Sequence, residues 1–219
     1  SENKTISSRL INQIIKNLIP KKMLEKNRLE LDFRSNIPTG YGLKSSSAIS
    51  SAVALSCAKA FGKKISDEEI LKLGAKTSIQ TKVSITGAYD DACSCHFGGF
   101  NVTDNLRMKL IHRELAPKDL QAIIFLPKSR KRGNLKRLKE FNNAFEKSWE
   151  LAERSDYWNA AILNGIATTS ILNSEPELIM RLINKDAYCA TISGNGPSII
   201  TITDKKHKTK IMKEFSGLD

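Results

Sequence analysis

Charged and apolar residues alternate over residues 29–34, a pattern of period two that predicts a strand. Apolar residues at helical spacing predict a short amphipathic helix over residues 10–18, and a run rich in Ala, Val and Leu predicts a longer helix over residues 48–61. Ser66 begins a Ser-x-x-Glu capping box, so a further helix is expected from there to about Thr77.

The chain as a whole mixes strands and helices without a regular βαβ repeat. Strands are predicted over residues 98–103, 108–113, 121–126, 187–192 and 198–203. Helices are predicted over residues 138–154, 156–173, 175–184 and 205–215. This irregular mixture predicts an α+β fold, with a boundary near residue 128 that divides the chain into halves of residues 1–127 and 128–219.

The 219-residue chain has a formal net charge of +12 and a pI near 9.6, which favours anionic partners such as nucleic acid or a small anionic substrate. The basic residues concentrate in residues 128–139 and 205–213. Neither stretch interleaves aromatic residues, as surfaces that bind single strands do. We interpret residues 205–213 as an exposed helix face, and residues 128–139 as either a mobile substrate lid or a solvated surface loop.

Other features of the composition narrow the class of protein. No run approaches 18 apolar residues, so no membrane-spanning helix is expected, and the first residues lack the apolar core of a signal peptide. The four cysteines have no CxxC spacing, which predicts neither a zinc site nor a disulfide framework. Reduced thiols in a cytoplasmic protein are the simplest interpretation.

A Gly/Ser segment over residues 37–48 lies where the strand at 29–34 is expected to lead into the helix at 48–61. Free backbone N–H groups and the positive end of the helix dipole meet at such a junction, which suits an anion such as phosphate. The serine hydroxyls add hydrogen-bond donors or a metal ligand. No glycine directly precedes Lys44, so this is not a Walker A loop, and a turn that only caps the helix is the alternative.

Two carboxylates, Asp90 and Asp91, lie beside Gly87 in a loop or helix start over residues 86–92. Adjacent side chains point in different directions, so at most one of the two is expected to face a given ligand. That one can act as a general base or contact Mg²⁺ while the other braces the site. The alternative is an ordinary acidic pair at a helix start.

The turn Ser193-Gly194-Asn195-Gly196-Pro197 joins the last two predicted strands. Gly-Asn-Gly is common in plain hairpin turns. A glycine-rich turn can also lie against another stretch of backbone without steric conflict, so it can brace the Gly/Ser segment or approach a phosphate.

Taken in order, these three segments resemble the GHMP kinases, the superfamily of galactokinase, homoserine kinase, mevalonate kinase and phosphomevalonate kinase. Pro38-Thr39-Gly40-Tyr41-Gly42-Leu43-Lys44-Ser45-Ser46-Ser47 fits the second motif of that superfamily throughout. Within it, Leu43-Lys44-Ser45-Ser46-Ser47-Ala48, the segment around Asp90 and Asp91, and the Ser193 turn are similar to the archaeal type of shikimate kinase.

The resemblance implies a ribosomal-S5-like half followed by a ferredoxin-like half, with the active site between them. It implies transfer of a phosphoryl group from ATP to shikimate, giving 3-phosphoshikimate and ADP for aromatic amino-acid synthesis, with Mg²⁺ as the metal. Asp91 matches the catalytic aspartate and Asp90 is the second choice, while Ser46 is the expected Mg²⁺ ligand. The resemblance implies that the nucleotide is held by Pro38, Gly40, Gly42, Leu43, Lys44, Ser45, Ser46, Ser47, Ala48, Gly194 and Gly196.

Two departures from the family are visible. The family begins with a Gly-rich strand segment ahead of the region where this sequence starts, so we expect a truncated, disordered or cleaved N-terminus. Some relatives carry a glutamate metal ligand where Gln80 stands, and an amide is a weaker Mg²⁺ ligand than a carboxylate. The carboxylate of shikimate requires a basic partner, for which the candidates are Arg34, Arg107, Arg130 and Arg132.

Two alternatives to shikimate kinase remain open from the sequence. One is a GHMP kinase for another small alcohol, such as homoserine or mevalonate. The other is a basic RNA-binding module, against which the acidic pair argues because it would repel phosphate in the absence of Mg²⁺. A nucleic-acid partner is therefore not expected. Since the sequence has no long apolar run, a membrane is not expected either. The protein is expected to be a monomer or a homodimer.

Overall fold

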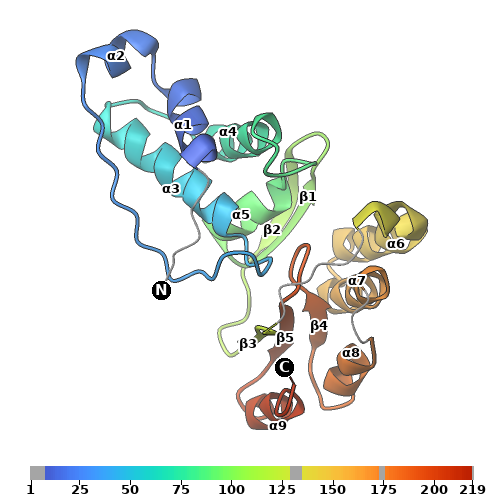
Figure 1. The fold of residues 1–219 in the computed structure, drawn as a ribbon. Helices are drawn as coiled ribbons and strands as arrows, with labels where there is room; N and C mark the ends of the chain where they lie inside the picture. The colour runs from blue at the N-terminus through green and yellow to red at the C-terminus, as the bar shows by residue number, and fades with distance from the viewer. Residues whose placement is uncertain (1–7, 129–134, 173–175, 219) are drawn as a thin grey trace. The chain divides into compact units, whose positions relative to one another are not determined.

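The computed structural model describes residues 8–128, 135–172 and 176–218. The chain packs into two compact units, one made of residues 1–37 and 44–115, the other of residues 38–43 and 116–219 (Figure 1). The chain therefore passes from the second unit to the first between Leu43 and Lys44, inside the Gly/Ser segment. The domain boundary expected near residue 128 stays a prediction.

The first unit is mainly helical. Its elements are α1 (Ser8–Leu18), α2 (Lys21–Lys26), α3 (Ser45–Ala60), α4 (Asp67–Gln80), α5 (Tyr89–Phe97), β1 (Phe100–Asp104) and β2 (Lys109–Glu114). The helices α1, α3 and α4 pack on one another around a core of Leu, Ile, Val and Ala side chains (Figure 1). The capping box at Ser66 is confirmed, because its hydroxyl accepts the Glu69 N–H and the Glu69 carboxylate accepts the Ser66 N–H.

The helix α5 packs on the antiparallel hairpin that β1 and β2 form. A small cluster of buried residues from α4 and α5 packs here against partly buried side chains that include one from β2, and Tyr89 and Cys93 are its most enclosed α5 members. The start of α5, where the acidic pair lies, is therefore held on a packed surface.

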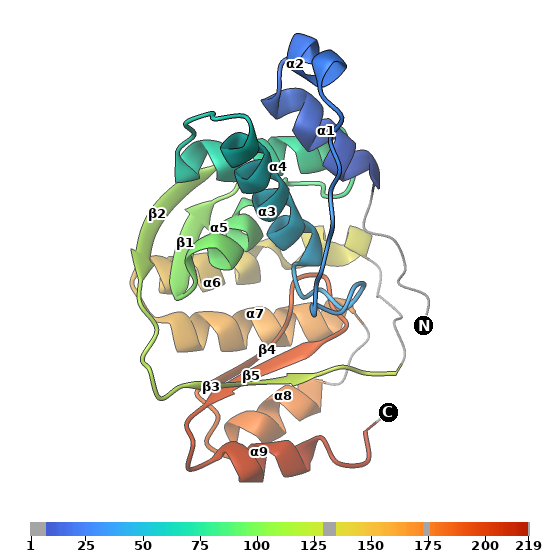
Figure 2. The same ribbon diagram turned by 90° about the vertical axis from the view of Figure 1, so that its left-hand side faces the viewer.

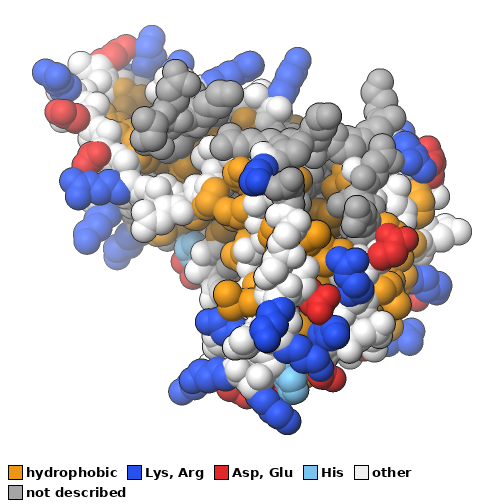
Figure 3. Space-filling view, turned by 60° about the horizontal axis from the view of Figure 1, so that its bottom comes forward, with side chains coloured by type: hydrophobic (Ala, Val, Ile, Leu, Met, Phe, Trp, Pro, Cys, Tyr) orange, Lys and Arg blue, Asp and Glu red, His pale blue; other side chains and the backbone are white. Residues whose placement is uncertain are grey.

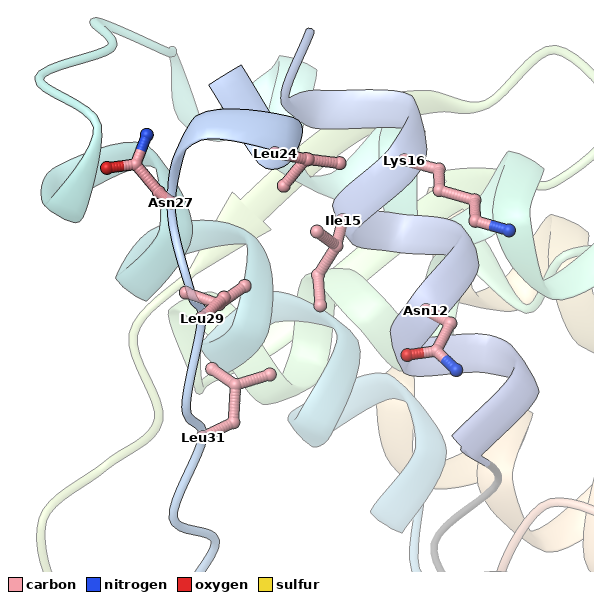
Figure 4. Close-up of a pocket in the computed structure, with 7 residues that line it drawn as sticks. All are labelled: Asn12, Ile15, Lys16, Leu24, Asn27, Leu29 and Leu31. Carbon is pink, nitrogen blue, oxygen red and sulfur yellow. The ribbon is translucent and has the colours of Figure 1, made fainter. Parts of the chain in front are cut away.

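The prediction of a strand over residues 29–34 is wrong. Residues 28–36 are irregular, and no strand in the described part of the chain pairs with them. Leu29 and Leu31 still turn toward the helices, where with Ile15 and Leu24 they point into a hollow of about 380 Å³ (Figure 4). Alternation tells which side of a segment is buried, but a strand also needs a neighbour for its backbone groups.

The second unit contains a three-stranded sheet. Its elements are β3 (Gln121–Phe125), a 3₁₀ helix (Leu135–Phe141), α6 (Asn142–Glu153), α7 (Tyr157–Ile171), α8 (Pro176–Ile183), β4 (Cys189–Ile192), β5 (Ile199–Thr203) and α9 (Lys208–Glu214). The strand order is β3-β5-β4 and both pairings are antiparallel. The helices α7 and α8 pack on β4, and α9 packs on β3 (Figure 2).

A close approach between α7 and β4 fixes the strand that leads into the Ser193 turn. A Cβ atom on Gly165 would lie 2.7 Å from the Ala190 carbonyl oxygen, so only glycine allows this helix to lie so near the strand. Ala190 is fully buried, and Ile192 at the end of β4 is nearly so.

The other predicted elements are confirmed with shifted ends. The helix predicted over residues 48–61 begins at Ser45, so the three serines lie in its first turn. The single helix predicted over residues 138–154 is a 3₁₀ helix followed by α6. The five strands predicted from residue 98 onward are all present, and their ends lie within about two residues of the predicted ones.

The surface of the described residues carries charges of both signs. The lysines of α9 and of the turn before it are exposed, and Lys210 pairs with Asp186. On the face in Figure 3, Lys and Arg side chains are interspersed with acidic and hydrophobic ones. Part of the basic stretch 128–139 lies outside the described residues. Within the described residues, no helix has both the length and the hydropathy to cross a membrane.

Candidate active site

The Ser193 turn braces the first half of the Gly/Ser segment, within the second unit. The Ser193 hydroxyl donates to the Gly42 carbonyl oxygen at 2.8 Å. Ser198 donates twice to the Tyr41 carbonyl oxygen, from its hydroxyl at 2.6 Å and from its backbone N–H at 3.2 Å. The turn therefore holds two successive carbonyl groups of the segment.

Gly42 is the point of closest approach between these two stretches of backbone. Its φ is +79°, and a Cβ atom built there would lie 2.0 Å from the Ser193 carbonyl oxygen. An L-residue would meet both the left-handed backbone strain and a collision with backbone that cannot rotate away.

The second half of the segment opens α3, within the first unit. Lys44 adopts the left-handed conformation, with φ +61°, and its carbonyl oxygen accepts the Ala48 N–H at 3.0 Å. No side chain caps this helix, and its first turn contains no acidic residue. The first-turn N–H groups of Ser45, Ser46 and Ser47 have no hydrogen-bond partner among the described residues. Such a helix start can bind an anion.

Asp91 lies in the first turn of α5 and forms an ion pair with Lys44. Lys44 Nζ is 2.7 Å from Asp91 Oδ1, and the two side chains are 25% and 22% exposed. Burial raises the pKa of the Asp91 carboxyl above its ordinary value; the Lys44 ammonium opposes that rise, and the charge of Asp90 adds to it. Asp91 is thus a partly desolvated carboxylate that has a lysine as its counter-ion.

Asp90 has a different partner. Its backbone N–H donates to Asn105 Oδ1 at 2.9 Å, and Asn105 Nδ2 donates to Asp90 Oδ1 at 2.7 Å. The Thr103 hydroxyl donates to the same Asn105 oxygen. The turn between β1 and β2 therefore clamps the start of α5 through Asp90, while Asp91 faces Lys44.

Two contacts of this site could not be found from the sequence. Asn105 lies between two predicted strands, and nothing in its spacing pairs it with Asp90. Lys44 was expected to contact phosphate, and its pairing with Asp91 joins residues far apart in the chain. The first contact is visible only once the β1–β2 turn lies beside α5, and the second only once the start of α3 does.

The other candidate residues have partners of their own or lie elsewhere. Gln80 Oε1 accepts a hydrogen bond from Asn17 Nδ2 at 2.9 Å. Arg34 pairs with Asp32, and Arg107 pairs with Asp104, and both arginine side chains are exposed. Two further candidates for the shikimate carboxylate lie outside the described residues, namely Arg130 and Arg132.

The chain matches proteins of known family. Residues 9–99 match the model of the GHMP kinases N terminal domain. The chain is 34% identical to the shikimate kinase of Pyrococcus furiosus over 194 residues, which cover 87% of this chain and 70% of that protein. The chain belongs to the shikimate kinase family. It is also 36% identical to the shikimate kinase of Methanosarcina mazei, over 84% of this chain and 64% of that protein.

Solved structures agree on the fold. A mevalonate kinase superposes with a TM-score of 0.61 at 18% identity, over 99% of this chain and 75% of that one. The homoserine kinase of Cytophaga hutchinsonii superposes with a TM-score of 0.60 at 20% identity, over 82% of this chain and 62% of that one. The chain therefore has the α+β fold of the GHMP kinases, as the three motifs predicted.

Replacing Gly42 by alanine should loosen the braced segment. The new Cβ atom would collide with the Ser193 carbonyl oxygen, so hydrogen exchange should accelerate at residues 38–44 and 193–198. Gly62→Ala is the matched control, because Gly62 also has a positive φ but a Cβ atom there meets nothing within 4 Å. Equal exchange in the two variants would show that backbone strain alone, and not the close approach, limits position 42.

Replacing Asn105 by alanine should destabilise the start of α5. The change removes both hydrogen bonds to Asp90, and the loss of a helix-capping side chain costs about 1 kcal/mol. We expect a lower urea midpoint and faster amide exchange at residues 89–92, whereas Asn36→Ala, at an exposed position, should change neither. Unaltered exchange at Asp90 in the Asn105 variant would contradict the clamp.

Proposed function

We propose that the protein transfers a phosphoryl group from ATP to the 3-hydroxyl of shikimate, giving 3-phosphoshikimate and ADP. The observation that carries this proposal is the sequence identity to shikimate kinases of 34% and 36%, which extends over most of the chain. The chain spans 70% and 64% of those two proteins, so the activity of the whole protein is part of the proposal.

The start of α3 fits the phosphates of ATP. Uncapped N–H groups, serine hydroxyls and the absence of acid from the first turn all favour an anion there. When bound, ATP supplies the phosphoryl group: the shikimate 3-oxygen forms the new O–P bond, the bond to the β-phosphate oxygen breaks, and ADP leaves with that electron pair. Ser45 and Ser47 are the expected phosphate donors.

The glycines have separate roles in the proposal. Gly40 and Gly42 both have positive φ and shape the segment before α3. Gly194 is exposed at the tip of the Ser193 turn, where it can approach a phosphate. Gly196 is buried and its N–H bonds to the Ser193 carbonyl oxygen, which favours a role in shaping the turn.

Ser46 is the residue that would hold Mg²⁺. Its side chain is exposed, and the described residues form no group of three His, Cys, Asp or Glu that could hold a metal ion by themselves. Mg²⁺ commonly keeps waters and binds one or two protein ligands together with substrate phosphates, so a single hydroxyl fits it. When bound, Mg²⁺ neutralises charge that develops on the phosphate oxygens.

Asp91 is the residue that would accept the proton of the shikimate hydroxyl. Of the two carboxylates at the start of α5, Asp90 is already held by Asn105, which favours Asp91. Burial raises the pKa of Asp91, and a raised pKa makes a carboxylate a better base.

The four cysteines are free, which supports a reducing, cytoplasmic location.

Two other functions are weaker candidates. Homoserine and mevalonate kinases share the fold at no more than 20% identity, which carries no argument about substrate. An RNA-binding role draws only on the positive net charge, and on the face in Figure 3 the basic side chains are interspersed with acidic ones.

Release of ADP should depend on shikimate. The complete gene product is incubated with Mg²⁺-ATP and, in turn, shikimate, homoserine and mevalonate, and ADP is measured by a coupled assay. Turnover with shikimate alone is the expected result. Turnover with another alcohol would move the assignment to that substrate, and a folded protein without turnover on any of the three would refute the proposal.

Replacing Asp91 by asparagine should lower kcat by about 10²–10⁴-fold, the range for loss of a positioned base. The parent's rate should rise with pH as Asp91 loses its proton, with a midpoint above the ordinary aspartate pKa because burial raises it. The rate of the Asp91→Asn variant should not show this rise with pH. Asp119→Asn, at an exposed position in the loop before β3, is the control and should keep both the rate and its rise with pH.

A further inference from the structure

Lys44 is the cation that the described residues provide for Asp91. Its Nζ atom lies 2.7 Å from Asp91 Oδ1, and no other ion pair to Asp91 is formed in the described part of the chain. Both side chains are largely shielded from water. Because neither charge is fully solvated, each depends on the other for compensation.

The backbone of Lys44 is held as firmly as its side chain. The residue is left-handed, and its carbonyl oxygen starts the hydrogen-bond ladder of α3. The Cys95 thiol, one helical turn after Asp91 on α5, lies 3.8 Å from that same carbonyl oxygen. One face of α5 therefore contacts Lys44 at both its backbone and its ammonium group.

The surroundings of the acidic pair explain why Asp91 needs this partner. Asp90 is the adjacent negative charge, and its own hydrogen bonds run to Asn105. Burial and the charge of Asp90 both favour the protonated form of Asp91, and the Lys44 ammonium is the group that opposes them. A proton acceptor must be ionised before it can act.

The phosphates have less need of Lys44. The first turn of α3 already offers unpaired backbone N–H groups and serine hydroxyls in a region free of acid. Those groups suit phosphate without a lysine.

We propose that Lys44 is a positioning residue, which holds the Asp91 carboxylate ionised and in place for the hydroxyl proton, and is not a ligand of the nucleotide phosphates. This inference rests on the proposed role of Asp91 in phosphorylating shikimate. It assigns Lys44 a function different from the one that its place in the Gly/Ser segment suggested.

The test compares Lys44→Met, Lys44→Arg, Asp91→Asn and the double variant Lys44→Met/Asp91→Asn in the complete gene product. Lys44→Met should lower kcat by about 10²-fold, the cost of misplacing a reacting group, with the KM for ATP close to that of the parent. Lys44→Arg should recover part of the rate, since it restores the charge. Adding Lys44→Met to Asp91→Asn should cost little more, because the two residues act as one unit.

A matched control separates this effect from general loss of charge. Lys72 also pairs with a carboxylate, Glu68, in the first unit, but on α4 and away from Asp91. Lys72→Met should leave kcat and KM unchanged.

Two measurements do not depend on turnover. Titration calorimetry of ADP without Mg²⁺ should give the same affinity for the parent and for Lys44→Met. The unfolding free energies of the parent, Lys44→Met, Asp91→Asn and the double variant should form a non-additive cycle, which reports the Lys44–Asp91 contact directly.

Different failures have different meanings. Absence of shikimate-dependent turnover in the parent would refute the proposed function and leave calorimetry and the unfolding cycle to judge Lys44. A several-fold loss of ADP affinity in Lys44→Met, or kcat effects that multiply in the double variant, would make Lys44 a phosphate ligand and overturn the positioning role. An additive unfolding cycle would overturn it as well.

Discussion

The backbone on either side of Leu43 is constrained by two unrelated sets of contacts. Before it, the carbonyl groups of Tyr41 and Gly42 accept hydrogen bonds from Ser198 and Ser193, at a distance that only glycine permits. After it, the left-handed Lys44 starts α3 and meets Asp91. Because Lys44 is held by its own contacts within the first unit, the first turn of α3 begins at a defined residue, and its N–H groups have no partner among the described residues. The groups proposed to bind phosphate are thus set by backbone geometry before any ligand arrives.

The acidic pair at the start of α5 shows how two identical side chains acquire different properties. Asp90 is satisfied by Asn105 from a neighbouring hairpin turn, so it serves to anchor the helix. Asp91 is partly buried beside a lysine, and its raised pKa means that the folded state holds its proton more tightly than the unfolded chain does. Above its unfolded pKa, keeping Asp91 ionised therefore costs folding stability, and that cost grows until the pH passes the folded pKa. A group that lowers stability in this way is expected where chemistry, and not packing, requires it.

Local signals in the sequence predicted the elements well where one segment determines its own structure. The capping box at Ser66 and the amphipathic pattern of α1 are examples. The irregular mixture of strands and helices predicted the α+β class, and the motifs predicted the GHMP kinase fold. The prediction was wrong over residues 29–34, because alternation does not specify a partner strand. The contacts of Lys44 with Asp91 and of Asn105 with Asp90 were also out of reach. Each joins residues that are distant in the chain, so neither propensity nor spacing contains them.

The position of Lys44 in the Gly/Ser segment does not by itself predict which group its ammonium contacts. In a Walker A loop, the lysine directly follows glycine and reaches the phosphates. Here Lys44 follows Leu43, adopts the left-handed conformation and directs its ammonium to a carboxylate on α5. An anion at the start of α3 would instead meet backbone N–H groups and hydroxyls, which carry no net charge but are already oriented. If the phosphates bind to these neutral, preorganised donors as proposed, Lys44, the one cation of the segment, is left to keep the Asp91 carboxylate ionised. Under the two proposals, the partner that the fold supplies to Lys44, more than its residue type, decides what this lysine does.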